Sequence, residues 1–346
     1  MSETQAFDIE PLLGDVFSGR TLSQERAEAV MGHLMDGELS QMQAAALLAA
    51  LRTRGETVDE VVGFARAMRE RAVKVPVRVS GPLLDTCGTG GTGVDTFNIS
   101  TASLFVLASG GVRVAKHGNR GVTRKSGAAD VLEALGAKLE ATPERLAESI
   151  EQVGLAFIFA KSHHPAMKFV APIRADLKAR TVFNSLGPLT NPAGANRQLL
   201  GVYDPALTEP LALVLAGLGT ERALVVHGDG IDELTVCGET RVTELGADGA
   251  TRTYTVHPKS VGLALYDRRE LSGGTPEENA VTIRALLNNE IHGAKRDVVL
   301  LNAGAALYLA DKAPSIEAGV EVAGELLNTG AAAEKLGAYL EFTQQG

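Results

Sequence analysis

The chain has 346 residues, 45% of them hydrophobic, with 38 glycines and two cysteines, and its 33 basic and 42 acidic residues give a net charge of −9. This composition excludes a disordered chain and a disulfide framework, and the acidic balance argues against general nucleic-acid binding. No apolar run reaches the ~18 residues of a membrane span, and the polar N-terminus lacks a signal-peptide pattern, so we expect a cytoplasmic protein. Its length fits two domains or, equally well, one large α/β unit with an appendage.

The first 75 residues carry helix signals and no strand-like alternation. Sequences of the form S/T-x-x-E/Q, which are typical of a capping box at a helix start, begin at Thr21, Ser40 and Thr57. Glycines stand where the preceding helices should end, at Gly19, Gly37 and Gly55. These signals predict four helices, near 8–18, 22–36, 41–53 and 58–72.

The third predicted helix is apolar on almost every face from Met42 to Leu51. A helix of this kind needs burial on all sides, which a small helical lobe does not easily provide. We therefore infer a subunit interface here; contact with the chain's own second domain is the alternative.

After Pro76 short apolar runs alternate with helical stretches, which is typical of a mostly parallel sheet with crossover helices. The predicted strands are 83–86, 112–116, 155–160, 199–203 and 223–227. The predicted helices between them are 98–109, 127–135, 165–178 and 206–217. An antiparallel hairpin is expected over 240–256, followed by two or more helices from 276 to 343. The predicted fold class is α/β, with a small α-helical domain beside a large α/β domain.

A glycine-rich loop follows the first predicted strand, between Asp85 and Asp95, and leads into a helix that starts near Asn98. Bare glycine amides beside a helix N-terminus can bind an anion, and asparagine is a good N-cap. A simple tight turn is the alternative. The spacing matches neither G-x-x-x-x-G-K-S/T nor G-x-G-x-x-G.

Two further segments reverse the acidic balance of the chain. Residues 113–125 contain five Lys or Arg and no acid on a glycine-broken loop, which favours anion binding over a solvated face. The segment from Lys161 to Arg174 contains two adjacent histidines without the partner spacing of a zinc site. Arg174 suits a carboxylate held bidentately, although the spacing alone slightly favours a plain basic helix face.

The last candidate is the carboxylate pair Asp232 and Glu233, which follows the strand predicted at 223–227. Carboxylate oxygens are ligands that magnesium takes, with substrate phosphate completing the coordination, whereas surface acids in a turn are the alternative. Together the loops suit a magnesium-bound polyphosphate and a second, acidic substrate. Cys87 is interpreted as a packed residue, because no base is marked for it.

Along its whole length the chain resembles the anthranilate phosphoribosyltransferase family. The resemblance rests on an ordered set of short motifs: G-T-G-G at 88–91, T-F-N-I-S-T at 96–101, K-H-G-N-R at 116–120, K-S-G at 125–127, H-P-A-M-K at 164–168, L-G-P-L-T-N-P at 186–192 and G-x-D-E at 230–233.

The resemblance implies a helical domain over 1–75, completed by a helical excursion at about 165–185, and an α/β domain over the rest of 76–346. It implies a homodimer joined through the helical domains and no nucleic-acid or membrane partner. The implied activity is transfer of phosphoribose from 5-phosphoribosyl 1-diphosphate to the amino group of anthranilate, in tryptophan synthesis, with Mg²⁺.

The family's functional residues map onto this sequence position by position. The resemblance implies catalytic roles for Lys116, Asp232, Glu233 and Arg174. It places magnesium on Ser100, Asp232 and Glu233. It places phosphoribosyl diphosphate on Gly88, Thr89, Gly90, Gly91, Thr92, Thr96, Asn98, Ile99, Ser100, Thr101, Lys116, His117, Gly118, Asn119, Arg120 and Ala128. It places anthranilate on Gly88, His117, Asn119, His164, Arg174 and Pro188.

At two of these positions the chain departs from the family pattern. Thr92 stands where the family usually has aspartate, and Ala128 stands where it usually has serine. The first change removes a charge and the second removes a hydrogen-bond donor. We expect weaker diphosphate or magnesium binding and retained activity, with Asp95 as a partial substitute for the missing aspartate.

Two other functions are compatible with a fold of this kind. A nucleoside phosphorylase-like enzyme would not need the Asp232–Glu233 pair or H-P-A-M-K. A non-catalytic nucleic-acid-binding paralogue would need a basic groove and degraded loops, whereas this chain is acidic and its loops are nearly complete.

Overall fold

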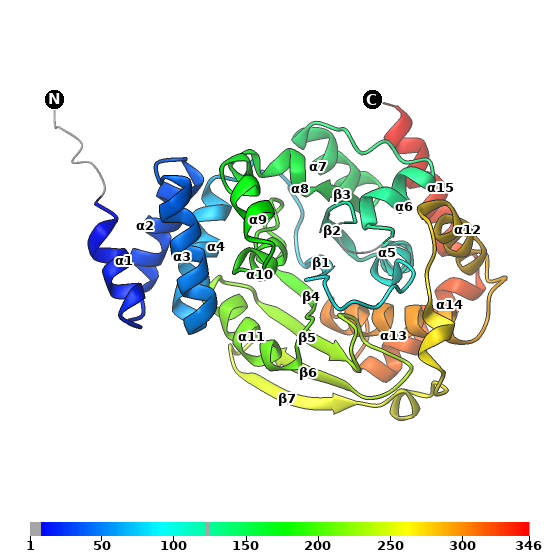
Figure 1. Ribbon diagram of the computed structural model, residues 1–346. Helices are drawn as coiled ribbons and strands as arrows, with labels where there is room; N and C mark the ends of the chain where they lie inside the picture. The colour runs from blue at the N-terminus through cyan, green and yellow to red at the C-terminus, as the bar shows by residue number, and fades with distance from the viewer. Residues whose placement is uncertain (1–7, 122–124, 346) are drawn as a thin grey trace. The chain divides into compact units, whose positions relative to one another are not determined.

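The structure is a computed structural model that describes residues 8–121 and 125–345. It divides the chain into two compact units, each built from two stretches of sequence (Figure 1). Unit 1 contains the residues up to Val73 together with Lys161–Thr190, and unit 2 contains Lys74–Ala160 and the residues from Asn191 onward. Within the described ranges, every helix is too short or too polar to cross a membrane.

Unit 1 is helical. Its N-terminal stretch forms α1 (Glu10–Phe17), α2 (Gln24–Met35), α3 (Gln41–Arg54) and α4 (Val58–Glu70), which confirms the four predicted helices. Its second stretch follows α8 (Ala160–His163) and forms η1 (Pro165–Phe169), α9 (Ala171–Leu177), α10 (Phe183–Leu186) and η2 (Gly187–Leu189). In this unit α9 packs on α3, and α10 packs on α4.

The prediction of one continuous helix over 165–178 was wrong. A 3-10 turn ends near Val170 and a separate helix starts at Ala171. Pro172 explains the break, because its ring would clash with the carbonyl of Lys168 in a continuous α-helix, whereas it is tolerated in the first turn of α9.

Two of the three predicted capping boxes are present, at Ser40–Gln43 and Thr57–Glu60. The third was wrong: Ser23, not Thr21, caps α2, and its hydroxyl accepts from the amide of Arg26. The three predicted stop glycines have φ values of 77°, 78° and 87°. This left-handed conformation favours glycine and ends each helix.

Glu60, a capping residue of α4, is fully buried and joins three parts of unit 1. Its carboxylate accepts from the amide of Leu22 at 2.9 Å and from that of Thr57 at 2.9 Å. It also pairs with Arg54 at the end of α3, at 2.6 Å. A buried carboxylate with these partners is well compensated, and its loss would leave Arg54 without its ion partner.

Unit 2 contains a seven-stranded sheet of order β3-β2-β1-β4-β5-β6-β7 (Figure 1). The strands are β1 (Leu83–Gly88), β2 (Arg113–Gly118), β3 (Leu155–Phe159), β4 (Arg197–Gly201), β5 (Arg222–Gly228), β6 (Thr240–Leu245) and β7 (Thr251–Val256). The first five strands pair in parallel, and β6 and β7 form an antiparallel hairpin. Each of these strands and the hairpin were predicted from the sequence.

Helices cover both faces of this sheet. They are α5 (Ile99–Ser109), α6 (Ala128–Ala134), α7 (Pro143–Gln152), α11 (Thr208–Gly217), α12 (Pro276–Leu287), α13 (Ala294–Leu309), α14 (Ile316–Asn328) and α15 (Ala331–Gln344), with 3-10 turns η3 (Pro205–Leu207), η4 (Pro258–Val261) and η5 (Arg268–Leu271). Leu84 and Val114 face the main core with α5 and α13. Ala115 and Ile158 face a second core under α7, a helix that the sequence reading missed.

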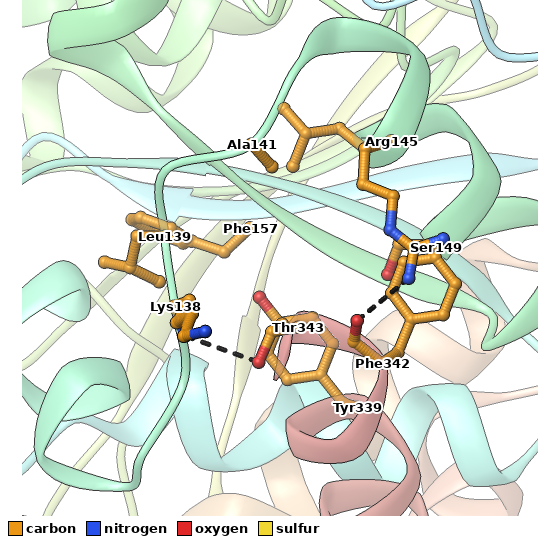
Figure 2. Close-up of a pocket in the computed structure, with 10 residues that line it drawn as sticks. Lys138, Leu139, Ala141, Arg145, Ser149, Phe157, Tyr339, Phe342 and Thr343 are labelled. Carbon is orange, nitrogen blue, oxygen red and sulfur yellow. Dashed lines mark hydrogen bonds between the residues drawn. The ribbon is translucent and has the colours of Figure 1, made fainter. Parts of the chain in front are cut away.

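The last helix, α15, docks on the segment around α7 through specific contacts (Figure 2). The guanidinium of Arg145 lies 3.5 Å from the ring centroid of Phe342 and donates to the Phe342 carbonyl at 3.0 Å. The amide of Lys138 donates to the hydroxyl of Thr343 at 3.3 Å. The residues that surround these contacts leave a cavity of only about 20 Å³. The segment from 138 to 145 is therefore held by residues 205 and 197 positions further along the chain.

Candidate functional site

The glycine-rich loop after β1 is bound directly to the predicted carboxylate pair. The amide of Gly90 donates to Asp232 Oδ2 at 2.8 Å, although the two residues are 142 positions apart. Gly90, Gly91 and Gly93 have φ values of 66°, 76° and 76°, a region that other residues rarely adopt. The loop following β1 and the loop following β5 therefore form one structure at the carboxyl edge of the sheet.

Two glycines allow Asp232 to lie this close to β1 and β4. A Cβ on Gly88 would lie 2.3 Å from Asp232 Oδ2, and a Cβ on Gly201 would lie 1.7 Å from the Asp232 carbonyl oxygen. Gly201 was missed by the sequence reading. It ends β4 opposite Gly88, and the shared edge of neighbouring parallel strands was the signal that could have identified it.

Lys116 and Ser100 are also brought together. Lys116 is 2% exposed, and its ammonium donates to the carbonyl of Thr86 in β1 and to the Ser100 hydroxyl at 3.1 Å. Ser100 lies in the first turn of α5. A lysine from β2, a carbonyl from β1 and a hydroxyl at a helix N-terminus thus converge beside the glycine loop.

Asn98 precedes α5 as predicted, but its side chain does not cap the helix. Its Oδ1 instead accepts from the Ser126 hydroxyl at 3.0 Å and from Asn279 Nδ2 at 2.9 Å, while its Nδ2 donates to the Ser126 carbonyl. The predicted N-cap position is therefore confirmed, but the side chain makes tertiary hydrogen bonds in place of a capping bond. The buried Asn279 was missed, and it ties the start of α12 to this loop.

The other residues of the glycine loop and of the first turn of α5 shape this edge. The Thr89 hydroxyl accepts from the Tyr203 amide at 3.0 Å, and the Thr92 hydroxyl accepts weakly from the Val94 amide at 3.5 Å. Thr96 forms an isolated antiparallel β-bridge with Ser272. Ile99 and Thr101 are buried in the first turn of α5. Asp95, the proposed substitute for the missing aspartate, is exposed.

Beyond β2 the basic loop is less positive than its sequence indicated. Arg120 is in ion pairs with Glu133 at 2.5 Å and with Asp130 at 3.0 Å, so acids of α6 compensate it. Gly118 ends β2, Asn119 is exposed, and Ala128 begins α6. Arg124, which contributed to the charge count of the loop, lies outside the described residues.

The predicted anthranilate residues divide between the two units. Gly88, His117 and Asn119 belong to unit 2, whereas His164, Arg174 and Pro188 belong to unit 1. In unit 1, Arg174 lies in α9 with its guanidinium 5.7 Å from the ring centroid of Phe183, and burial lowers its pKa. His164 is buried immediately before η1, and Pro188 lies in η2.

Cys87 is not an activated thiol. Gln198 donates to its sulfur at 3.2 Å, and burial raises the pKa of the thiol well above its usual range. A thiol with this environment is a weak nucleophile, since the reactive form is the thiolate. The interpretation of Cys87 as a packed residue is consistent with this geometry.

The donors available to a metal are oxygens. Asp232 is 4% exposed and Glu233 is partly exposed. Residues 8–121 and 125–345 contain no group of three or more His, Cys, Asp or Glu that could hold an ion. Two carboxylates and a hydroxyl fit magnesium, which usually takes one or two carboxylates and completes its shell with phosphate and water.

Comparison with known families agrees with this architecture. Residues 80–333 match the model of the glycosyl transferase family, a/b domain, and residues 10–72 match the model of the glycosyl transferase family, helical bundle domain. The fold and the site thus define a glycosyl transferase with a helical bundle and an α/β domain.

Among curated proteins, the anthranilate phosphoribosyltransferase of Rubrobacter xylanophilus is 51% identical over 95% of both chains, and that of Symbiobacterium thermophilum is 51% identical over 97% of this chain and 98% of its own. The structure of the enzyme from Thermus thermophilus superposes with a TM-score of 0.91 at 49% identity, over 96% of this chain and 99% of that one. The chain belongs to the anthranilate phosphoribosyltransferase family.

A more distant structure carries ligands. The Saccharomyces cerevisiae enzyme in complex with PRPP and Mg has a TM-score of 0.88 at 25% identity, over 97% of this chain and 99% of that one. These matches favour the transferase over the nucleoside phosphorylase-like and nucleic-acid-binding alternatives.

Proposed function

We propose that this protein transfers the phosphoribosyl group of 5-phosphoribosyl 1-diphosphate to the amino group of anthranilate, releasing diphosphate. The observation that carries the proposal is the convergence at one sheet edge of the glycine loop, the buried Lys116 and Asp232. The family's activity and the PRPP and Mg bound to the yeast relative support it.

In the first step the C1–O bond to the diphosphate breaks and negative charge develops on the departing oxygens. The Lys116 ammonium is already directed by Thr86 and Ser100, so it can stabilise this charge without reorganisation. Glycine amides of the 88–91 segment are further donors for the diphosphate. The ribose carbon becomes electron-poor as the bond breaks, and the amine nitrogen then attacks it, forming the C1–N bond and releasing one proton.

Magnesium fits the oxygen donors of this edge, and we propose that Ser100, Asp232 and Glu233 hold it. When bound, the ion neutralises part of the charge that develops on the diphosphate. The Gly90 amide fixes Asp232 Oδ2, so the orientation of one carboxylate is set by the glycine loop.

For anthranilate we propose Arg174 as the partner of the carboxylate, with His164, Pro188, His117, Asn119 and Gly88 lining its path. A guanidinium binds a carboxylate bidentately, which fixes the ring plane and therefore the direction of the amino group. An aromatic amine is nucleophilic without prior deprotonation, so positioning supplies much of the rate.

We also propose that the protein acts in the cytoplasm as a homodimer joined through its helical unit. The third helix supports the dimer: Met42 is 82% exposed, and Ala49 on the same helix is also exposed. A substitution of Met42 by Glu should shift the purified protein from dimer to monomer in analytical ultracentrifugation. A monomeric parent protein would contradict the proposal.

The transfer is tested by the fluorescence of anthranilate, which should fall only when pure protein, phosphoribosyl diphosphate and magnesium are all present. Lys116→Met should lower kcat by about 10²-fold or more, the typical loss for an electrostatic donor to the transition state. Lys335→Met is the matched control, since the Lys335 ammonium also donates to a backbone carbonyl, that of Val153 at 2.9 Å, away from the site. Constant fluorescence with the parent protein would refute the proposed activity.

A further inference from the structure

The two halves of the sheet separate beside the site. β1 pairs with β2 only at Leu83 and Leu84, although both strands continue for several residues. On their outer sides the ladders persist, from β1 to β4 as far as Gly88 and from β2 to β3 as far as Gly118. The opening therefore begins at Asp85 and leads to the edge where Lys116 and His117 lie.

A buried carboxylate and a buried amide fill this opening on one face. Asp85 is 1% exposed; its Oδ1 accepts from the His117 amide at 3.1 Å and its Oδ2 accepts from Asn191 Nδ2 at 2.8 Å. The same Nδ2 donates to the Ala115 carbonyl at 2.7 Å. Side chains thus make the bonds to β2 that a continuous backbone ladder would otherwise make.

Lys116 occupies the opening on the other side of the β2 backbone. Its ammonium reaches the Thr86 carbonyl, and β2 makes no ladder pair at Thr86. The positive charge of Lys116 also lowers the pKa of Asp85 against the larger raising effect of burial. The separation of the strands therefore lets this lysine reach the Thr86 carbonyl and the Ser100 hydroxyl.

A purely structural role does not account for this arrangement. A paired ladder would join β1 to β2 without burying a charge, whereas a buried carboxylate carries a desolvation cost. We propose that Asp85 and Asn191 are positioning residues for the transfer reaction, which hold β1 and β2 apart and set the place of Lys116 and His117. The inference rests on the proposed function, in which Lys116 stabilises the departing diphosphate.

Both carboxylate oxygens of Asp85 accept hydrogen bonds from donors. An isosteric change of one oxygen to an amino group therefore tests the pair. In Asp85→Asn one side-chain position becomes an amino group that faces either the His117 amide or Asn191 Nδ2. Asn191 cannot turn to compensate, because its Nδ2 is bonded to Ala115 and its Oδ1 accepts from the Ala193 amide at 2.9 Å. One donor must therefore face another donor in this variant.

The experiment compares D85N, N191A and the double variant with E244Q. Glu244 is the matched control, since it is a buried acceptor of the same unit, bonded to Tyr254, Tyr308 and Arg252. We expect kcat to fall by about 100-fold in D85N, the loss that a displacement of about 1 Å can cause, with a much smaller change in the KM for phosphoribosyl diphosphate. The double variant should lose no more than D85N, because the two side chains act as one unit. E244Q should lose thermal stability and keep its kcat.

Amide hydrogen exchange over residues 114–118 gives a readout that does not need turnover, and exchange should accelerate in D85N but not in E244Q. If D85N does not accumulate as folded protein, N191A supplies both measurements. An unchanged kcat in folded D85N, or multiplicative losses in the double variant, would overturn the inference. If the parent protein does not convert anthranilate, the proposed function is refuted. Unchanged amide exchange over residues 114–118 in D85N would then overturn the positioning role separately.

Discussion

Replacing Gly201 by alanine should lower the activity of the site by displacing the backbone that supports it, without changing a charged residue. The added Cβ would lie 1.7 Å from the Asp232 carbonyl oxygen and 2.4 Å from its carbonyl carbon. An ordinary carbon–oxygen contact is ~3.3 Å, so β4 and the loop bearing Asp232 must separate by about 1.6 Å. The obstacle is backbone rather than a flexible side chain, so it cannot be relieved by a rotamer change.

This displacement moves the carboxylate that the Gly90 amide holds. We expect kcat/KM to fall by about 10²-fold, the typical loss for a misplacement of about 1 Å, and the magnesium concentration for half-maximal rate to rise. Overpacking of this kind costs about 1–3 kcal/mol, which corresponds to a fall in Tm of about 2–12 °C.

The assay is the loss of anthranilate fluorescence at several magnesium concentrations, with Tm measured in parallel. Gly324→Ala is the control, since Gly324 lies inside α14 with nothing within 4 Å of an added Cβ. The control should keep full activity and gain about 0.5–1 kcal/mol of stability. A G201A protein with parental kcat/KM and magnesium dependence would refute the argument that close backbone approach positions Asp232.

Three further predictions concern other parts of the molecule. Glu60→Gln should destabilise the protein by about 3–5 kcal/mol in urea unfolding followed by circular dichroism, because Arg54 loses its buried ion partner. The control Glu321→Gln, an exposed change in α14, should leave the free energy of unfolding almost unchanged. Equal losses of stability in the two variants would exclude this explanation. Burial raises the pKa of Asp85 from 3.8 to about 6, so the contribution of Asp85 to stability is complete below its unfolded pKa and is lost as the pH rises through about 6. The free energy of unfolding of the parent should therefore fall by an amount of order 3 kcal/mol between pH 4 and 7, and that of D85N should not show this fall. Parallel pH profiles of the two proteins would contradict this. Thr92→Asp and Ala128→Ser should tighten magnesium or diphosphate binding, measured as a lower half-saturating concentration, and parental kinetics would show that the departures are compensated.

The strands and most of the helices could be predicted because their signals are local. Apolar runs, capping hydroxyls and stop glycines act within a few residues of where they stand, so the mostly parallel sheet and the two confirmed capping boxes followed from the sequence, whereas the strand order did not. Helix α7 was missed although Leu146 and Ile150 are spaced for one helix face, because the helix predicted at 127–135 already supplied a crossover between the strands expected at 112–116 and 155–160. Thr21 and Ser23 show the limit of such signals: two hydroxyls lie near one start, and only the one adjacent to the first turn caps it.

The site was predictable as a set of loops but not as a network. Glycines after a strand and carboxylates after another indicated the same sheet edge, and the structure brings Gly90 and Asp232 into contact. The partners of Asn98 and Asp85 were not predictable, because Asn279 and Asn191 lie 181 and 106 residues away from them. No local pattern marks which of many buried amides will meet a given side chain.

The docking of α15 has a consequence for biosynthesis. Its Phe342 and Thr343 contact Arg145 and Lys138, and Lys335 reaches the carbonyl of Val153 just before β3. Long-range contacts of this kind form late when a chain is made from its N-terminus. The β2–β3 side of the sheet therefore lacks these contacts until the ribosome has synthesised α15, so this side of unit 2 completes its packing last.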